Sequence, residues 1–134
     1  EAMCARLAAR RLHDADLGAL EAALARCEAA AAQRDPDAYF YANEDFHRAL
    51  YTASHNDFLV EQTLTLQRKL RPYRRLQLRV RHRMQHSLAE HAEILAALRA
   101  GDADQAMAAT QRHVVVQGER FADLLASLQL LTAA

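Results

Sequence analysis

The stretch DPDAYFYANEDFHRALYTAS, residues 35–54, decides the fold. Asp35 followed by Pro36 marks a helix start, because an aspartate side chain accepts free backbone N–H groups and proline fits the first helical position. Helical spacing then places five residues on the inward face of a helix over 36–54, namely Phe40, Asn43, His47, Leu50 and Ser54. The stretch therefore predicts an amphipathic helix that buries an amide and an imidazole.

The rest of the sequence also indicates helices. Hydrophobic residues make up 51% of the 134 residues, and only 3 Gly, 2 Pro and no Trp occur, which argues against a strand-rich fold. Start and stop signals place helices at about 1–13, 16–33, 36–54, 57–80, 87–100 and 102–128. Pro72 should kink the fourth helix, and Gly101 should end the fifth in a left-handed cap. We expect one all-α domain over residues 1–134, folded as a helical bundle.

Charge and hydropathy exclude several classes of protein. Seventeen basic residues balance seventeen acidic ones, so the chain lacks the positive excess that binding to a nucleic acid backbone requires. No apolar run approaches the ~20 residues of a membrane span, and the start resembles no signal peptide. Cys4 and Cys27 lack the spacing of a disulfide or zinc–thiolate framework. These features predict a soluble, cytoplasmic protein with no membrane partner.

Four side chains that can bind a metal fall on buried faces of three predicted helices. Asn43 and His47 are four residues apart and lie on one helix face, while His91 and His113 belong to the apolar stripes of their own helices. Burying three imidazoles without partners is costly, and one divalent cation would satisfy all of them. Imidazole nitrogen suits zinc or nickel, and a neutral amide leaves the ion's double charge uncompensated.

Periodicity alone leaves other interpretations open. Each histidine could be a satisfied core residue in a ligand-free dimerisation bundle. A single-metal hydrolase would also use an open coordination position, although no obvious general base lies at the site, because Glu90 and Glu93 flank His91 on other helix faces. A di-iron or dimanganese enzyme is disfavoured, because its site needs the E-x-x-H motif twice. Glu44 and His47 form one such motif, but the residues three positions before His91 and His113 are Leu88 and Thr110.

A basic segment lies between Glu61 and Glu90, where no acidic residue occurs. We expect most of its basic side chains to form a solvated face or a docking surface, with one or two turned inward to hold an anion. The candidates in this segment are Arg68, Lys69, Arg71, Arg74, Arg75, Arg79, Arg81 and Arg83.

The segments NEDFHRALYTASHNDFL and SLAEHAEILAALRAGDADQAMAATQRH resemble the FCD domain, the effector-binding C-terminal domain of the FadR-type branch of GntR transcription regulators. The resemblance covers nearly the whole chain. It implies an antiparallel bundle of six or seven helices that is a homodimeric regulator rather than an enzyme. It also implies a divalent metal held by Asn43, His47, His91 and His113, although many members of the family have Asp in place of Asn43.

The resemblance further implies a small carboxylate effector, such as a hydroxy acid, sugar acid or dicarboxylate, that chelates the metal. Arg74 and Arg75 match a basic pair of the family's fourth helix, and one of them should face the cavity. Tyr73, Gln77 and Gln117 are further candidates by helical position. DNA would be bound only by an N-terminal winged helix domain, which is expected to be missing from this chain.

Overall fold

The computed structural model describes residues 1–115, and this part of the chain is helical apart from short joints. The helices are α1 (Ala2–Arg11), α2 (Asp14–Ala32), α3 (Pro36–Thr52), α4 (Asp57–Gln77) and α5 (Arg83–Arg99), followed by a sixth helical stretch at 103–115. The all-α prediction is therefore confirmed. Within the described residues, no helix is both long enough and apolar enough to cross a bilayer.

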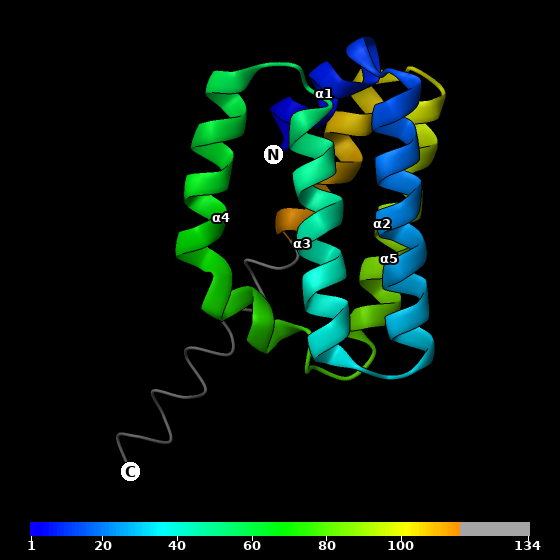
Figure 1. The fold of residues 1–134 in the computed structure, drawn as a ribbon, viewed down its shortest axis with the longest axis vertical. Coiled ribbons are helices and arrows are strands. Elements are labelled where there is room, and N and C mark those ends of the chain that lie inside the picture. Colours follow the sequence, from blue (N-terminus) through cyan, green and yellow to red (C-terminus); the bar gives the residue numbers. More distant parts are fainter. Residues whose placement is uncertain (116–134) are drawn as a thin grey trace.

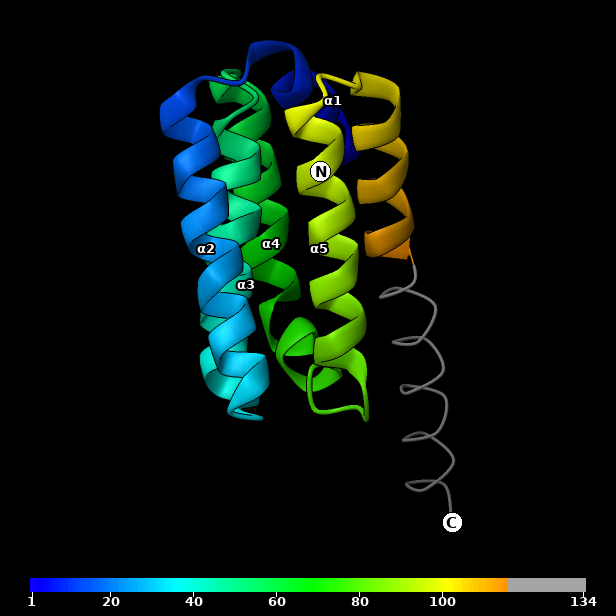
Figure 2. The ribbon, with the colours of Figure 1, turned by 90° about the vertical axis from the view of Figure 1, so that its right-hand side faces the viewer.

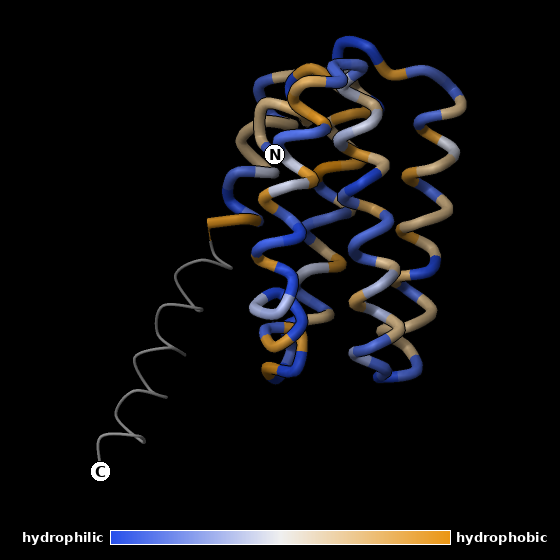
Figure 3. The backbone as a smooth tube through the Cα atoms, turned by 60° about the vertical axis from the view of Figure 1, so that its left-hand side comes forward, coloured by the Kyte–Doolittle hydropathy of each residue, from blue (hydrophilic) through white to orange (hydrophobic). Residues whose placement is uncertain are grey.

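The long helices stand side by side and alternate in direction, while the short α1 lies across one end (Figures 1 and 2). α2 packs against α3 and α5, and α4 packs against α3. Hydrophobic and hydrophilic residues alternate along every helix (Figure 3), as expected when one face of each helix is buried. The result is the antiparallel bundle that the resemblance implied.

The helix ends are set by the capping residues that the sequence predicts. The Asp35 carboxylate accepts hydrogen bonds from the backbone N–H groups of Asp37 and Ala38, at 3.0 and 2.9 Å. Asp102 accepts one from Gln105, and Gly101 before it adopts a left-handed φ of 66°. Because side chains and a positive φ satisfy the free backbone groups here, short joints suffice between antiparallel helices.

Two helix boundaries differ from the prediction. α4 continues through Pro72 and bends in its second half (Figure 1), and it ends at Gln77. α5 begins at Arg83 and not at Ser87, because the inward-turned Arg83 pairs with Glu90 of the same helix at 2.8 Å. Arg83 is only 2% exposed, so a buried contact within α5 accompanies the extension of the helix beyond its predicted start.

α4 differs from the other helices in what it buries. Its buried residues are all polar, namely Thr63, Gln67, Arg74 and Gln77. The main core is instead made of apolar side chains such as Phe46, Leu50 and Ile94. A helix that turns polar groups toward a bundle is suited to line a binding cavity, because buried polar groups need partners.

Candidate functional site

Three histidines from three helices meet in the bundle core. His47 of α3, His91 of α5 and His113 of the sixth helix are each 0% exposed, and their nitrogens lie within 4.8 Å of one another. Asn43 lies one turn before His47 on α3 and is 4% exposed. The structure therefore brings the three histidines together, and the helical position of Asn43 places it on the same face of α3 as His47.

The closest approach within this group joins the Nε2 atoms of His47 and His113, which are 3.1 Å apart. Two donors bound to one ion at about 2.1 Å would be separated by roughly 3.0–3.4 Å, so this spacing fits a shared metal. At most one proton can lie between the two nitrogens, which leaves at least one lone pair directed at the other ring.

Carboxylates lie behind two of the three imidazoles. Glu90 Oε2 is 2.6 Å from His113 Nδ1, and Glu1 Oε2 is 3.0 Å from His47 Nδ1. A carboxylate that holds the Nδ1 proton leaves the Nε2 lone pair free and fixes the ring orientation, as commonly found behind metal-binding histidines. Only the contact at His113 has the geometry of a hydrogen bond, whereas the one at His47 is an ion-pair contact, so Glu90 fixes its ring more firmly than Glu1 does.

The two carboxylates are ionised and are balanced by arginines. Burial opposes ionisation of Glu90, but hydrogen bonds from His113 and Arg83 lower its pKa to about 2. Burial likewise opposes ionisation of Glu1, and its contacts with His47 and Arg74 hold its pKa well below the usual range. Each negative charge is thus paired with one guanidinium, so the surroundings would leave the charge of a bound cation largely uncompensated.

Three polar atoms beside the His47–His113 pair have no hydrogen-bond partner among the described residues. They are Asn43 Oδ1 and both ring nitrogens of His91. The His91 ring stacks on Phe46 at a centroid distance of 4.2 Å, and burial keeps its pKa well below the usual value, so the ring is neutral. Unsatisfied buried lone pairs are costly, and a divalent ion would satisfy them. The donor set therefore fits the metal that the sequence predicts.

Glu90 lies closer to the histidine group than its helix face suggests. Glu90 lies on a different face of α5 from His91, but the sixth helix packs on that side, and the carboxylate reaches His113. Glu93 instead points to the surface, where it pairs with Arg112 at 3.7 Å. Because Glu90 is held by two partners behind His113, it is not placed as a general base at an open coordination position.

The two candidate arginines are placed differently. Arg74 is buried, and its guanidinium contacts the Glu1 carboxylate through Nη2. Its Nη1 atom is also buried and has no hydrogen-bond partner in the described part of the chain. Arg75 is exposed and binds Asp37 at 2.8 Å on the surface. Of the pair, only Arg74 faces the interior.

The other effector candidates are divided in the same way. Gln77 is 8% exposed and lies on the buried face of α4 with Arg74, whereas Tyr73 is 41% exposed. Gln117 lies outside the described residues. A cavity of about 340 Å³ adjoins Arg74 and Glu1, and its walls include Thr63, Leu66, Leu70 and Val114. Its size suits a small organic ligand.

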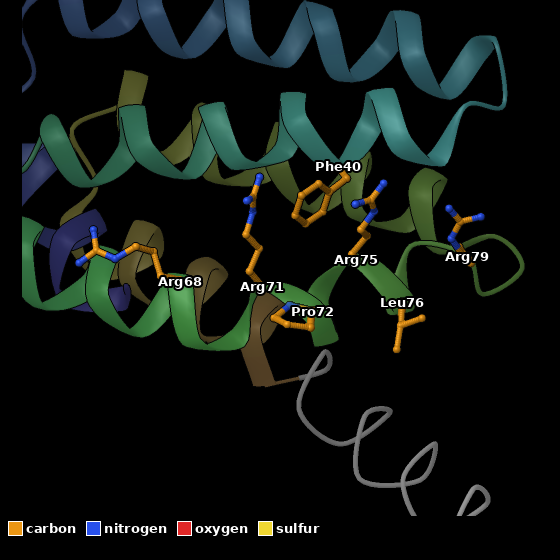
Figure 4. Close-up of a pocket in the computed structure, with 7 residues that line it drawn as sticks. All are labelled: Phe40, Arg68, Arg71, Pro72, Arg75, Leu76 and Arg79. Carbon is orange, nitrogen blue, oxygen red and sulfur yellow. The ribbon is translucent and has the colours of Figure 1, made fainter.

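Four of the eight basic residues of this segment line a solvated groove between α3 and α4 (Figure 4). Phe40, Pro72 and Leu76 line it together with four arginines, Arg68, Arg71, Arg75 and Arg79. Arg71 binds Glu44 through two nitrogens, and Arg75 and Arg79 share Asp37. The interpretation of these side chains as a solvated face is therefore confirmed.

The sequence interpretation did not identify Glu1 as part of the site. Its contacts with His47 and Arg74 join residues far apart in the chain, 73 positions in the case of Arg74. No local motif marks such a residue, because its role depends on where α1 packs.

Comparison with known proteins agrees with this architecture. The structure is similar to E. coli McbR/YncC, with a TM-score of 0.75 and 21% sequence identity over 89% of this chain and 62% of that chain. This chain thus spans less than two thirds of the length of that protein. The comparison with curated proteins gives no match. The family model of the FCD domain matches residues 1–115, and the chain therefore belongs to the FCD domain family.

Proposed function

We propose that this chain is the ligand-sensing domain of a GntR-family transcription regulator and that it holds one divalent metal ion through Asn43, His47, His91 and His113. Membership of the FCD family supports the regulatory role. The observation that carries the metal proposal is the buried group of three histidines, in which neither ring nitrogen of His91 has a hydrogen-bond partner among the described residues. Nitrogen donors of this kind favour zinc or nickel.

The bound ion would supply a positive charge that attracts the carboxylate of an effector. Its protein ligands would be three neutral imidazoles and one amide oxygen, with Glu1 and Glu90 orienting two of the rings. Three or four protein donors leave positions for a chelating anion on an ion that accepts six ligands. The effector we propose is therefore a small carboxylate, such as a hydroxy acid, sugar acid or dicarboxylate.

Arg74 is the residue that we propose to contact the far end of the effector. It is buried beside the cavity, and its Nη1 atom offers a donor that no described residue uses. Its Nη2 atom already contacts Glu1, so an effector carboxylate would either share the guanidinium with Glu1 or displace it. Gln77 is the next candidate, because it is buried on the same helix. The positions of Arg75 and Tyr73 favour surface roles, and Gln117 remains a candidate from the sequence.

In this proposal the domain acts in a cytoplasmic homodimer and performs no catalysis itself. DNA would be bound by a winged helix domain N-terminal to this chain, and the effector would change the affinity of that domain for its operator. A single-metal hydrolase is the rival proposal. It is less well supported, because Glu90, the carboxylate nearest to His113, is engaged by Arg83 and has a pKa of about 2.

A thermal-shift screen of small organic acids tests the function directly. We expect hydroxy, sugar or dicarboxylic acids to raise the unfolding temperature of the untagged, metal-loaded protein, since a ligand that binds only the folded state stabilises it. A chelator should abolish the effect. A neutral ligand that stabilises the metal-free protein equally well would contradict the mechanism, and hydrolysis of carboxylate esters would favour the rival enzyme.

Changing Asn43→Asp should strengthen metal binding and weaken the anionic effector. The substitution adds a negative charge to the proposed coordination group, which favours the cation and offsets the charge that attracts the carboxylate. Titration calorimetry with zinc and then with the acid found in the screen measures both effects. Asn56→Asp is the matched control, because Asn56 caps α4 and aspartate caps equally well. Unchanged affinities in Asn43→Asp would show that this side chain does not face the ion.

A further inference from the structure

A second group of metal-binding side chains lies where two helix junctions meet. His13 precedes α2, Asp16 lies in its first turn, and His55 lies in the turn between α3 and α4. Their donor atoms all lie within 4.8 Å of one another. The sequence indicates only a helix end at His13 and a turn at His55, because Asp16 and His55 are 39 positions apart.

The two imidazoles face the same carboxylate oxygen. Asp16 Oδ2 is 2.7 Å from His55 Nε2 and 3.7 Å from His13 Nδ1, and the ring centroids are 4.5 Å apart. An ion pair between a histidine and an aspartate involves only one imidazole beside the carboxylate. Two imidazoles and one carboxylate form instead a donor set that is typical of zinc and related ions.

The backbone around this group is held in place by other contacts. Arg11 donates to the carbonyl oxygens of Ser54 and His55, at 2.9 and 3.2 Å. His55 adopts a left-handed φ of 46°, which is uncommon for a residue other than glycine and is kept only where surrounding contacts impose it. The backbone N–H of His13 donates to Asp16 Oδ2 at 2.9 Å. The donors are thus brought together before any ion binds.

The group is open to solvent. The side chain of His13 is 71% exposed and that of His55 is 37% exposed, whereas that of Asp16 is 13% exposed. Exposed histidine rings can rotate at little cost, which permits the adjustment from a 2.7 Å hydrogen bond to the wider spacing of two metal ligands. Solvent can supply the remaining ligands, so an ion could enter and leave without unfolding the bundle.

We propose that His13, Asp16 and His55 form a second divalent transition-metal site, separate from the histidine group in the core. Nitrogen donors favour zinc or nickel over magnesium or calcium, which prefer oxygen. A bound ion would connect the α1–α2 junction to the α3–α4 turn. Because it would crosslink segments that are distant in the sequence, it should stabilise the folded chain.

The test uses untagged protein with its tightest metal site already filled. Zinc is then titrated by calorimetry, and the ions per chain are counted by native mass spectrometry. We expect one additional ion, and we expect His13→Gln, His55→Gln and Asp16→Asn each to weaken its binding by roughly tenfold or more. His86→Gln is the matched control, because His86 is another exposed histidine and lies away from this group. It should leave the titration unchanged.

The outcomes separate this site from the one in the core. If the core holds no ion, wild-type protein should still bind a single zinc that His55→Gln weakens. If both sites exist, His55→Gln should retain the tight ion and lose the weaker one. The proposal is overturned if no zinc binding responds to substitutions of these residues while circular dichroism shows that the variants are folded.

Discussion

Replacing His91 by alanine is expected to abolish metal binding in the core and to lower the free energy of unfolding by about 2–5 kcal/mol, the range for truncating a large buried side chain. His91 is 0% exposed and stacks on Phe46, so alanine leaves a cavity as well as removing two ring nitrogens. At a metal concentration 1,000 times its Kd, loss of the ion would remove about 4 kcal/mol more. Elemental analysis and urea unfolding with and without metal measure the two effects.

The comparison of metal-loaded and metal-free protein separates coordination from packing. Metal should stabilise the wild type strongly, whereas His91→Ala should keep only the smaller stabilisation expected from the weaker site at His13, Asp16 and His55. His86→Ala is the control on the same helix, because His86 is exposed and its removal should change neither quantity. A wild-type protein that binds no divalent ion after reconstitution, and whose stability ignores the chelator, would contradict the proposed core site.

Replacing Arg74 by alanine is expected to weaken binding of the carboxylate effector by a factor of roughly ten or more, since a hydrogen bond to a charged group contributes ~1.5–3 kcal/mol. Arg74 is the one member of the Arg74–Arg75 pair that faces the interior. Calorimetric titration with the acid selected by the thermal-shift screen measures the loss. Arg74→Lys should recover only part of the affinity for the effector, because lysine keeps the positive charge but cannot make the bidentate hydrogen bonds of a guanidinium.

Arg75→Ala is the matched control for this experiment. Arg75 carries the same charge one position further along α4, but it binds Asp37 on the surface. We expect it to bind the effector as the wild type does. Removing Arg74 also leaves the Glu1 carboxylate buried without its guanidinium, so the stability of Arg74→Ala has to be measured in parallel. Equal losses in the two alanine variants would contradict the assignment of Arg74 to the effector cavity.

Much of the fold follows from local sequence signals. Helices begin after the capping residues Asp35 and Asp102, and α5 ends before Gly101. These caps involve backbone groups only a few residues away, so short sequence motifs predict them. Helical spacing also placed His47 and His113 on buried faces, because a residue's face depends only on its position within its own helix. The sequence predicted that α5 begins at Ser87, but it begins at Arg83, whose side chain pairs with Glu90. No capping motif in the sequence indicates this earlier start.

The sequence by itself thus determined the helices, their inward faces and the residue types that are available to bind a metal. Only the tertiary structure decided which of these groups meet. It turned Arg74 inward and Arg75 outward, placed Glu1 behind His47, and brought His13 to His55 at the other group. The physical reason is that helical periodicity repeats every few residues, whereas these contacts join side chains whose distances are set by how whole helices pack.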